Sequence, residues 1–199
     1  MVALADAQKK QSIPTWEIAV VISSNPRAEG LKKASDMGLK TVAIQHSDFD
    51  SKQAYERAIL DELRASGVTL VLLAGYMKLL GPTLLSEYQT SIMNIHPSLL
   101  PAFKGLNAQK QALEYGVKTS GCTVHFVDES LDGGPIILQE AVPVLAGDTE
   151  SCLSERILVK EHHSYPKAVQ LYAEGRLQVK NRVVEILGQN DETKQGVIR

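Results

Sequence analysis

Residues 52–74 of this chain read KQAYERAILDELRASGVTLVLLA and decide its fold class. From Lys52 to Ala65, apolar residues recur every three or four positions, which is the spacing of an amphipathic helix. Gly67 is typical of the residue that ends a helix. Val68 to Ala74 is a short apolar run of the kind found in buried parallel strands. The stretch therefore predicts a helix that leads into a buried strand.

The same alternation of strand and helix patterns continues on both sides of this stretch. The elements predicted before residue 97 are strands at Glu17–Ile22, Leu39–Ile44 and Val68–Ala74, a strand ending at His96, helices at Ala28–Met37 and Lys52–Ala65, and a short helix after Pro82. Repeated β-α units predict an α/β fold: a doubly wound, Rossmann-like, mostly parallel sheet with helices on both faces.

The C-terminal part predicts one long helix followed by a hairpin. Thr149 is a suitable N-cap for a helix that runs towards Ala173, and Pro166 within it predicts a kink or a break. A hairpin is expected around Lys180-Asn181, and residues 188–199 read as a polar tail.

Length and composition agree with a small soluble enzyme. The chain has 199 residues, 44% of them hydrophobic, which is enough for one domain over 1–199 with a substantial core. A net charge of −2 argues against a nucleic-acid-binding surface, and no apolar run approaches a membrane span of ~20 residues. The first ten residues lack the apolar segment of an export signal, so a cytoplasmic location is expected. Cys122 and Cys152 are too few for a disulfide framework.

The sequence NIHPSLLP at residues 94–101 carries the first candidate catalytic groups. Asn94 and His96 lie two apart near a strand end, so both side chains project from the same face. An amide can stabilise an oxyanion, and a histidine can move a proton near neutral pH. Taken alone, such a pair is more often a strand end with a hydrogen-bonded core histidine.

Asp132 is the third candidate, in the sequence LDGGPI at residues 131–136. It lies between two strand-like runs, at residues 121–127 and 135–139. Asp-Gly-Gly-Pro by itself is typical of a turn, so a hairpin loop without catalytic function is the alternative.

Four motifs that occur together in one order favour the catalytic over the structural interpretation. They are NIHPSLLP, F-K-G-x-N, GCTVHFV and LDGGPI. From about Trp16 to Gly175 the chain resembles the phosphoribosylglycinamide formyltransferases of purine synthesis. The resemblance implies formyl transfer from 10-formyltetrahydrofolate, a co-substrate, to the amine of 5-phosphoribosylglycinamide, without a metal. It assigns oxyanion stabilisation to Asn94, proton transfer to His96 and support of the charged imidazolium to Asp132.

The resemblance also assigns binding residues. Those expected to contact folate are Lys52, Met77, Lys78, Leu79, Leu80, Asn94, Asp128 and Asp132, and Glu161 is expected to contact the ribonucleotide. Both lysines stand where many relatives have arginine, which replaces bidentate pairing with a point charge. The alternatives are that residues 76–80 form a packed turn and that Glu161 is a solvated helix edge. Small molecules are the expected partners, with no nucleic acid or membrane, and the chain is expected to be a monomer or a homodimer.

Other functions remain open at this point. One is a sister activity, formyltetrahydrofolate hydrolase or methionyl-tRNA formyltransferase. Another is a catalytically impaired folate-binding remnant, and a nucleotide-binding structural module is the most distant.

The N-terminus departs from the resemblance. The opening strand and the phosphate-binding loop of the family have no counterpart, and residues 1–15 read as the remainder of the first helix. We therefore expect unpaired strand edges at the centre of the sheet and weaker binding of the ribonucleotide than of folate. Leu100-Pro101 is a candidate cis peptide bond.

Overall fold

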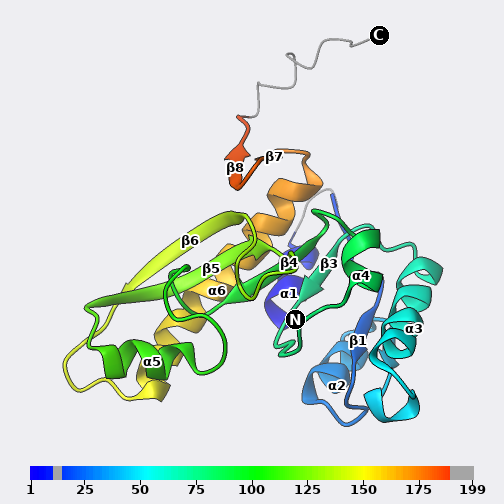
Figure 1. The fold of residues 1–199 in the computed structure, drawn as a ribbon, viewed down its shortest axis with the longest axis horizontal. Coiled ribbons are helices and arrows are strands. Elements are labelled where there is room, and N and C mark those ends of the chain that lie inside the picture. The colour runs from blue at the N-terminus through cyan, green and yellow to red at the C-terminus, as the bar shows by residue number, and fades with distance from the viewer. Residues whose placement is uncertain (11–14, 189–199) are drawn as a thin grey trace.

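The structure is a computed structural model that describes residues 1–10 and 15–188 (Figure 1). Its elements are α1 (Val2–Lys9), β1 (Val21–Ser23), α2 (Glu29–Asp36), β2 (Thr41–Ala43), the 3₁₀-helix η1 (His46–Asp48), α3 (Lys52–Ala65), β3 (Val71–Leu73), α4 (Pro82–Glu87), β4 (Ile92–His96), α5 (Ala108–Tyr115), β5 (Thr119–Phe126), β6 (Ile136–Pro143), α6 (Glu150–Ala173), β7 (Leu177–Lys180) and β8 (Val183–Ile186). Except for Gly188, the expected polar tail lies outside the described residues.

The described strands form two sheets. β1 and β2 pair in parallel as a two-stranded sheet, and the other strands form a six-stranded sheet in the order β3-β4-β5-β6-β8-β7. β3 and β4 are parallel, whereas β5 is antiparallel to both β4 and β6. The predicted α/β, Rossmann-like class is confirmed, and each antiparallel pair includes at least one strand after residue 97.

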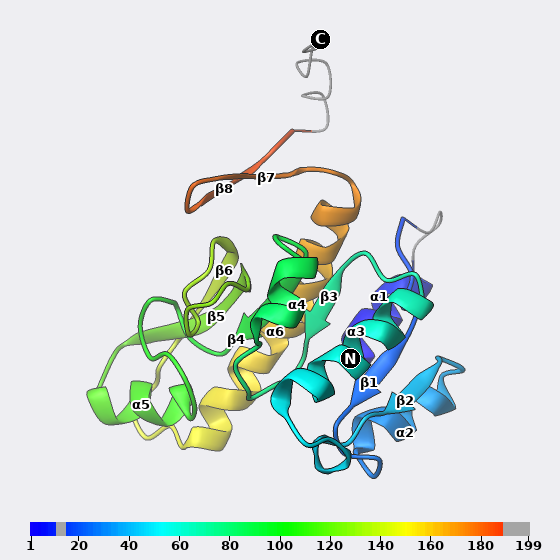
Figure 2. The ribbon, with the colours of Figure 1, turned by 45° about the vertical axis from the view of Figure 1, so that its right-hand side comes forward.

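Helices cover both faces of the larger sheet because residues alternate along its strands. Leu72 of β3 packs in a cluster with Leu4 of α1 and Val169 of α6. Its neighbour Val71 packs in a second cluster, with Leu60 of α3 and other residues of α3 and α4. Successive strand residues point to opposite faces, so α1 and α6 cover one face and α3 and α4 the other. Figure 2 shows α3 and α4 towards the viewer, with α1 behind α3 and α6 behind α4.

Most predicted elements are present, with shorter strands than expected. α3 has the predicted bounds, and Gly67 after it has a φ of +65°, the left-handed conformation that favours glycine. The hairpin β7–β8 turns at Asn181, as predicted. Of the kink or break expected at Pro166, the break is excluded, because α6 continues from Glu150 to Ala173 with the proline inside it.

The expectation of unpaired edges agrees with the pairing observed. Within residues 1–10 and 15–188, β1 pairs with β2 alone and β3 with β4 alone, so one edge of each has no strand partner. α1 packs against α6 through Leu4. Residues 15–18 form hydrogen bonds with side chains of both α1 and α6. Trp16 Nε1 donates to Gln170 Oε1 over 3.0 Å, and the Ile18 amide donates to Gln8 Oε1 over 3.1 Å.

Candidate active site

β4 places Asn94 and His96 on the face of the sheet that α3 and α4 cover. Ile92 packs in the cluster with α3 and α4, whereas Met93 and Ile95 pack in the cluster with α6. Because faces alternate along a strand, Asn94 and His96 share the face of Ile92. The prediction that both side chains project together is confirmed.

His96 and Asp132 come together although they lie far apart in sequence. Asp132 Oδ2 lies 3.5 Å from His96 Nδ1. The other ring nitrogen, Nε2, lies 2.9 Å from the Phe103 carbonyl oxygen, which can only accept, so Nε2 carries a hydrogen. Asp132 Oδ2 also accepts the Gly105 N–H over 2.8 Å. His96 is only 5% exposed, so its imidazole is held in a defined position with Nδ1 facing a carboxylate.

His125 is a site residue that the sequence reasoning missed. It lies opposite Asn94 in the β4–β5 register. Its Nδ1–H donates to the Phe126 carbonyl over 2.8 Å, which leaves Nε2 free to accept from Asn94 Nδ2 at 3.3 Å. Burial lowers the pKa of His125, while Asp132 and His96 act on it electrostatically in opposite directions. A neutral His125 therefore orients the Asn94 amide and lies near both other candidates.

The sequence gives only part of the evidence that would identify His125 as a site residue. His125 lies two residues after Thr123 in the predicted strand GCTVHFV, so the two share a face. The β4–β5 register decides which face this is and brings His125 to Asn94, and the sequence does not give that register.

The loop after β4 is held by side chains from β5 and β6. Thr123 Oγ1 donates to the Ser98 carbonyl over 2.7 Å and accepts the Leu100 N–H over 3.0 Å. Gln139 Nε2 donates to the Leu100 carbonyl over 2.9 Å and to Thr123 Oγ1 over 3.0 Å. The Leu100–Pro101 bond is cis, as predicted. This network fixes the segment that leads to Phe103, the hydrogen-bond partner of His96.

The residues expected to contact folate fall into two groups. The first lies at α3 and in the segment of residues 74–81 that follows β3, where Met77 and Leu79 are exposed and Leu80 is half-buried. Lys78 Nζ lies 6.0 Å from the Tyr55 ring centroid. Lys52 Nζ lies 3.7 Å from Glu56 Oε1. Lys52 and Lys78 are thus linked to neighbouring residues of α3.

The second group is in the loop between β5 and β6. Asp128 Oδ1 accepts the Ser130 N–H over 2.9 Å and also the Ser130 hydroxyl. A Cβ on Gly134 would collide with the Phe126 carbonyl oxygen, so only glycine allows this close approach. These contacts shape the turn that brings Asp132 back to His96. Residues 74–81 of the first group begin beside Asn94, because Leu73 pairs with Asn94. Asn94 also pairs with His125, next to the end of β5, after which the second group follows.

Glu161 lies on the opposite side of the sheet. On α6 it continues the row of Leu153 and Ile157, which are buried as predicted. Its half-buried carboxyl has a raised pKa because of desolvation. Burial raises the pKa of the Cys122 thiol, and a hydrogen bond with Ser164 lowers it. The charge of Glu161 also raises this pKa, so Glu161 lies near Cys122. No hydrogen bond or ion pair within residues 1–10 and 15–188 joins it to the three catalytic candidates.

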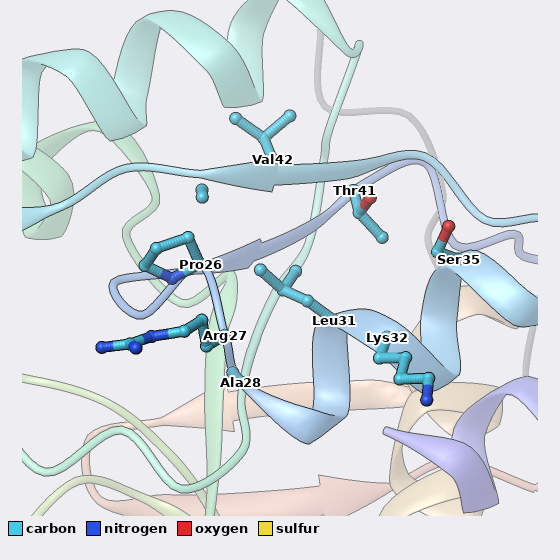
Figure 3. A pocket seen from close by; sticks show the side chains of 9 residues that line it. Pro26, Arg27, Ala28, Leu31, Lys32, Ser35, Thr41 and Val42 are labelled. Carbon is cyan, nitrogen blue, oxygen red and sulfur yellow. The ribbon is translucent and has the colours of Figure 1, made fainter.

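A separate hollow of about 500 Å³ lies between α2 and β2 (Figure 3). Its lining includes Arg27 and Lys32, but the figure shows these two side chains pointing in different directions. None of the predicted site residues lines it, so it is distinct from the candidate active site.

The described part of the chain has neither a metal-binding cluster nor a membrane-spanning helix. No cluster of three or more His, Cys, Asp or Glu side chains there could hold a metal ion. No helix there is both long enough and apolar enough to cross a membrane.

Comparison with known proteins gave consistent matches. A family model described as "Formyl transferase" matches residues 1–169. The phosphoribosylglycinamide formyltransferase of Escherichia coli (strain K12) is 41% identical over 187 residues, covering 94% of this chain and 88% of that protein. The crystal structure of glycinamide ribonucleotide transformylase 1 from Symbiobacterium toebii superposes with a TM-score of 0.91 at 50% identity, covering 94% of this chain and 87% of that one.

Some relatives are much longer. The chain is 47% identical over 179 residues to the trifunctional purine biosynthetic protein adenosine-3 of Gallus gallus. The match covers 89% of this chain but only 18% of that protein.

Proposed function

The chain belongs to the formyl transferase family, and we propose that it transfers the formyl group of 10-formyltetrahydrofolate to the amine of 5-phosphoribosylglycinamide in purine biosynthesis. The observation that supports this most is the placement of Asn94, His96 and Asp132 around one buried His125. An amide donor, an imidazole and a carboxylate are the groups that acyl transfer between two nitrogens requires.

Asn94 would stabilise the oxyanion. The acceptor amine attacks the formyl carbon, a C–N bond forms, and the carbonyl oxygen takes the negative charge. One hydrogen of the Asn94 amide is directed to His125 Nε2, so the second is available to that oxygen. Loss of such a donor typically costs ~3 kcal/mol of barrier.

His96 would carry the proton. Its Nε2–H is committed to the Phe103 carbonyl, so a proton moves to or from the reactants through Nδ1, beside Asp132. As the bond from the formyl carbon to N10 of the folate breaks, N10 gains a proton and the attacking amine loses one. Asp132 favours the imidazolium form during this exchange. The separation of 3.5 Å suits a contact that tightens once substrate is bound.

The folate would lie between the two groups of predicted contacts. The exposed Met77 and Leu79 offer apolar contact next to the end of β3, and Leu80 supports them from the core. The Lys52 side chain is half-exposed and Lys78 is exposed, so both ammonium groups can pair with the carboxylates of the folate tail. Asp128 to Asp132 would contact the pterin through the loop backbone, with Asn94 at the junction.

For the ribonucleotide, Glu161 is the contact that the resemblance assigns. A raised pKa suits Glu161 to a partly buried ligand contact, although its position near Cys122 separates it from His96.

We further propose that the chain forms a single domain, acts in the cytoplasm as a monomer or homodimer, requires no metal and has no nucleic-acid or membrane partner. A net charge of −2 and small-molecule substrates support this assignment.

The direct test is formyl transfer from 10-formyltetrahydrofolate to 5-phosphoribosylglycinamide, followed by formation of the formylated product. Omitting the amine distinguishes the alternative, because a hydrolase releases formate without it. Formate release at an unchanged rate without acceptor would replace the proposed transfer with hydrolysis.

A further inference from the structure

Glu56 is a buried carboxylate that the proposed mechanism does not use. It lies in the second turn of α3 and is 1% exposed. Its neighbours on the helix, Tyr55, Ile59 and Leu60, belong to the hydrophobic cluster between α3, α4 and β3. Burying a carboxylate in such surroundings is unfavourable unless it forms strong hydrogen bonds.

The hydrogen-bond partner of Glu56 is a backbone group at the end of the loop expected to contact folate. Glu56 Oε1 accepts the Gly81 N–H over 2.6 Å, a short bond to an ionisable group. Gly81 directly follows Leu80, at the end of the segment of residues 74–81. This contact therefore joins α3 to that segment.

The packing around the contact is close enough to require glycine. A Cβ on Gly81 would lie 2.5 Å from Glu56 Oε2, and Gly81 does not have a left-handed φ. The constraint at this position is therefore the space taken by the carboxylate and not the backbone conformation.

The same carboxylate contacts a second predicted folate residue. Lys52 Nζ lies 3.7 Å from Glu56 Oε1, one helical turn away. Lys52 is half-exposed, so its ammonium has solvent on one side and the carboxylate on the other. Lys78 lies over the ring of Tyr55, the residue next to Glu56. Glu56 thus contacts Lys52 and the end of the loop directly, and its neighbour Tyr55 contacts Lys78.

We propose that Glu56 is a positioning residue for folate: it fixes the segment of residues 74–81 and orients Lys52, without touching the reacting atoms. This inference rests on the proposed function, because it takes that segment and Lys52 as folate contacts. A loop that is already ordered before binding loses less conformational entropy when the ligand binds. Removing the contact is therefore expected to act on folate binding and to spare both the chemical step and the ribonucleotide.

The test compares Glu56→Leu and Glu56→Gln with a control in the same helix. Glutamine keeps an acceptor for the Gly81 N–H, whereas leucine removes it. We expect Glu56→Leu to raise KM for 10-formyltetrahydrofolate about tenfold, with kcat and the ribonucleotide KM within about threefold of wild type. Glu56→Gln should restore most of the folate KM. Leu63→Ala, a buried substitution in the same cluster, should lower the melting temperature without changing the folate KM.

Two further measurements cover the case in which Glu56→Leu does not fold. Gly81→Ala approaches the same contact from the loop side and should also raise the folate KM. Hydrogen exchange of the Gly81 amide without ligand should be faster in Glu56→Gln than in wild type, because a neutral acceptor binds it less strongly.

The outcomes separate this inference from the proposed function. A wild-type chain without formyl transfer would contradict the proposed function, while Gly81 exchange would still test the contact. An active wild type whose folate KM is unchanged in Glu56→Leu and Gly81→Ala would overturn the positioning role. Equal increases in the folate KM for Glu56→Leu and Leu63→Ala would reduce Glu56 to a structural residue.

Discussion

His125 shows how one hydrogen bond sets the state of a site residue. Because its Nδ1–H is directed to a backbone carbonyl, the ring presents a lone pair to Asn94. A protonated ring would present a second N–H to the Asn94 amide nitrogen, two donors facing each other. Desolvation and this geometry both favour the neutral ring, so the orientation of Asn94 depends on a histidine that stays uncharged.

This state predicts a pH dependence of stability. The pKa of His125 is lowered in the folded state, so below about 6.5 the unfolded chain binds a proton that the folded chain does not. Stability should therefore fall as pH drops below about 6.5, by at most ~1.4 kcal/mol per pH unit from this residue, until the folded-state pKa is reached. Denaturant unfolding at pH 7.5 and 5.5 is the measurement. His125→Asn should lose less stability over this interval than wild type, and equal losses would contradict a neutral buried ring.

At His96 we predict a loss of catalysis without a loss of folate binding. His96→Ala removes the proton carrier and should lower kcat by ~10² or more. Binding of a folate analogue, measured by calorimetric titration, should change little because the folate contacts lie mainly in other segments. Near-normal turnover in this variant would exclude the imidazole as the proton carrier.

Among the elements, β5 and β6 act as the support for the loop after β4. Thr123 is fully buried, and its hydroxyl serves one carbonyl and two N–H groups at once. Through Leu100 and Ser98 it fixes the chain leading to Phe103, so a strand residue without reactive chemistry controls the position of His96.

Thr123→Val tests this support. Valine has nearly the same shape but leaves the buried Leu100 N–H without its acceptor, which should lower the free energy of unfolding by about 1–3 kcal/mol. Turnover should fall as well, because the loop that holds His96 loosens. Chemical denaturation and steady-state kinetics measure the two effects. Thr119→Val, at an exposed position of the same strand, is the control and should change neither.

α6 shows where a local rule fails. Proline inside a helix removes one backbone hydrogen bond, and a kink or a break is the expectation. Yet Tyr165 and Ala168 on either side of Pro166 are buried against the sheet. The Tyr165 hydroxyl also reaches the carbonyl oxygens of Leu73 and Met93 over 2.8 and 2.9 Å. Packing of the helix face outweighs the cost of the missing hydrogen bond.

Over the whole molecule, stability should be unevenly distributed. β1 and β2 are three-residue strands that pair only with each other among the described residues, whereas β4 and β5 lie within the six-stranded sheet. An isolated strand pair is marginal by itself and depends on packing. The unit of β1, α2 and β2 should therefore open at lower free energy than the larger sheet.

Native-state hydrogen exchange can measure this difference. The amides of Val21 and Ile44, which donate to the carbonyls of Lys40 and Ser23, should exchange at lower free energies of opening than the amides in β4 and β5, for example that of Val124. Uniform free energies across both sheets would show that the chain unfolds as one cooperative unit.

The sequence by itself determined the element types and the identity of three candidate catalytic residues. Period-3.6 and short apolar patterns are local, so α3, the short helix α4 and the strand ending at His96 follow from neighbouring residues. Asn94 and His96 share a face because strand alternation is also local. Asp132 was found through its motif, and the folate residues and Glu161 came from the resemblance.

Only the tertiary structure decided which distant groups meet. The β4–β5 register sets His125 against Asn94, and the folded loop brings Asp132 to His96. The contact of Glu56 with Gly81 and the support from Thr123 and Gln139 likewise join segments separated in sequence. Such contacts depend on strand register and on the space left by packed side chains. Both are set by the burial of the whole sheet between its helices, and no local pattern encodes them.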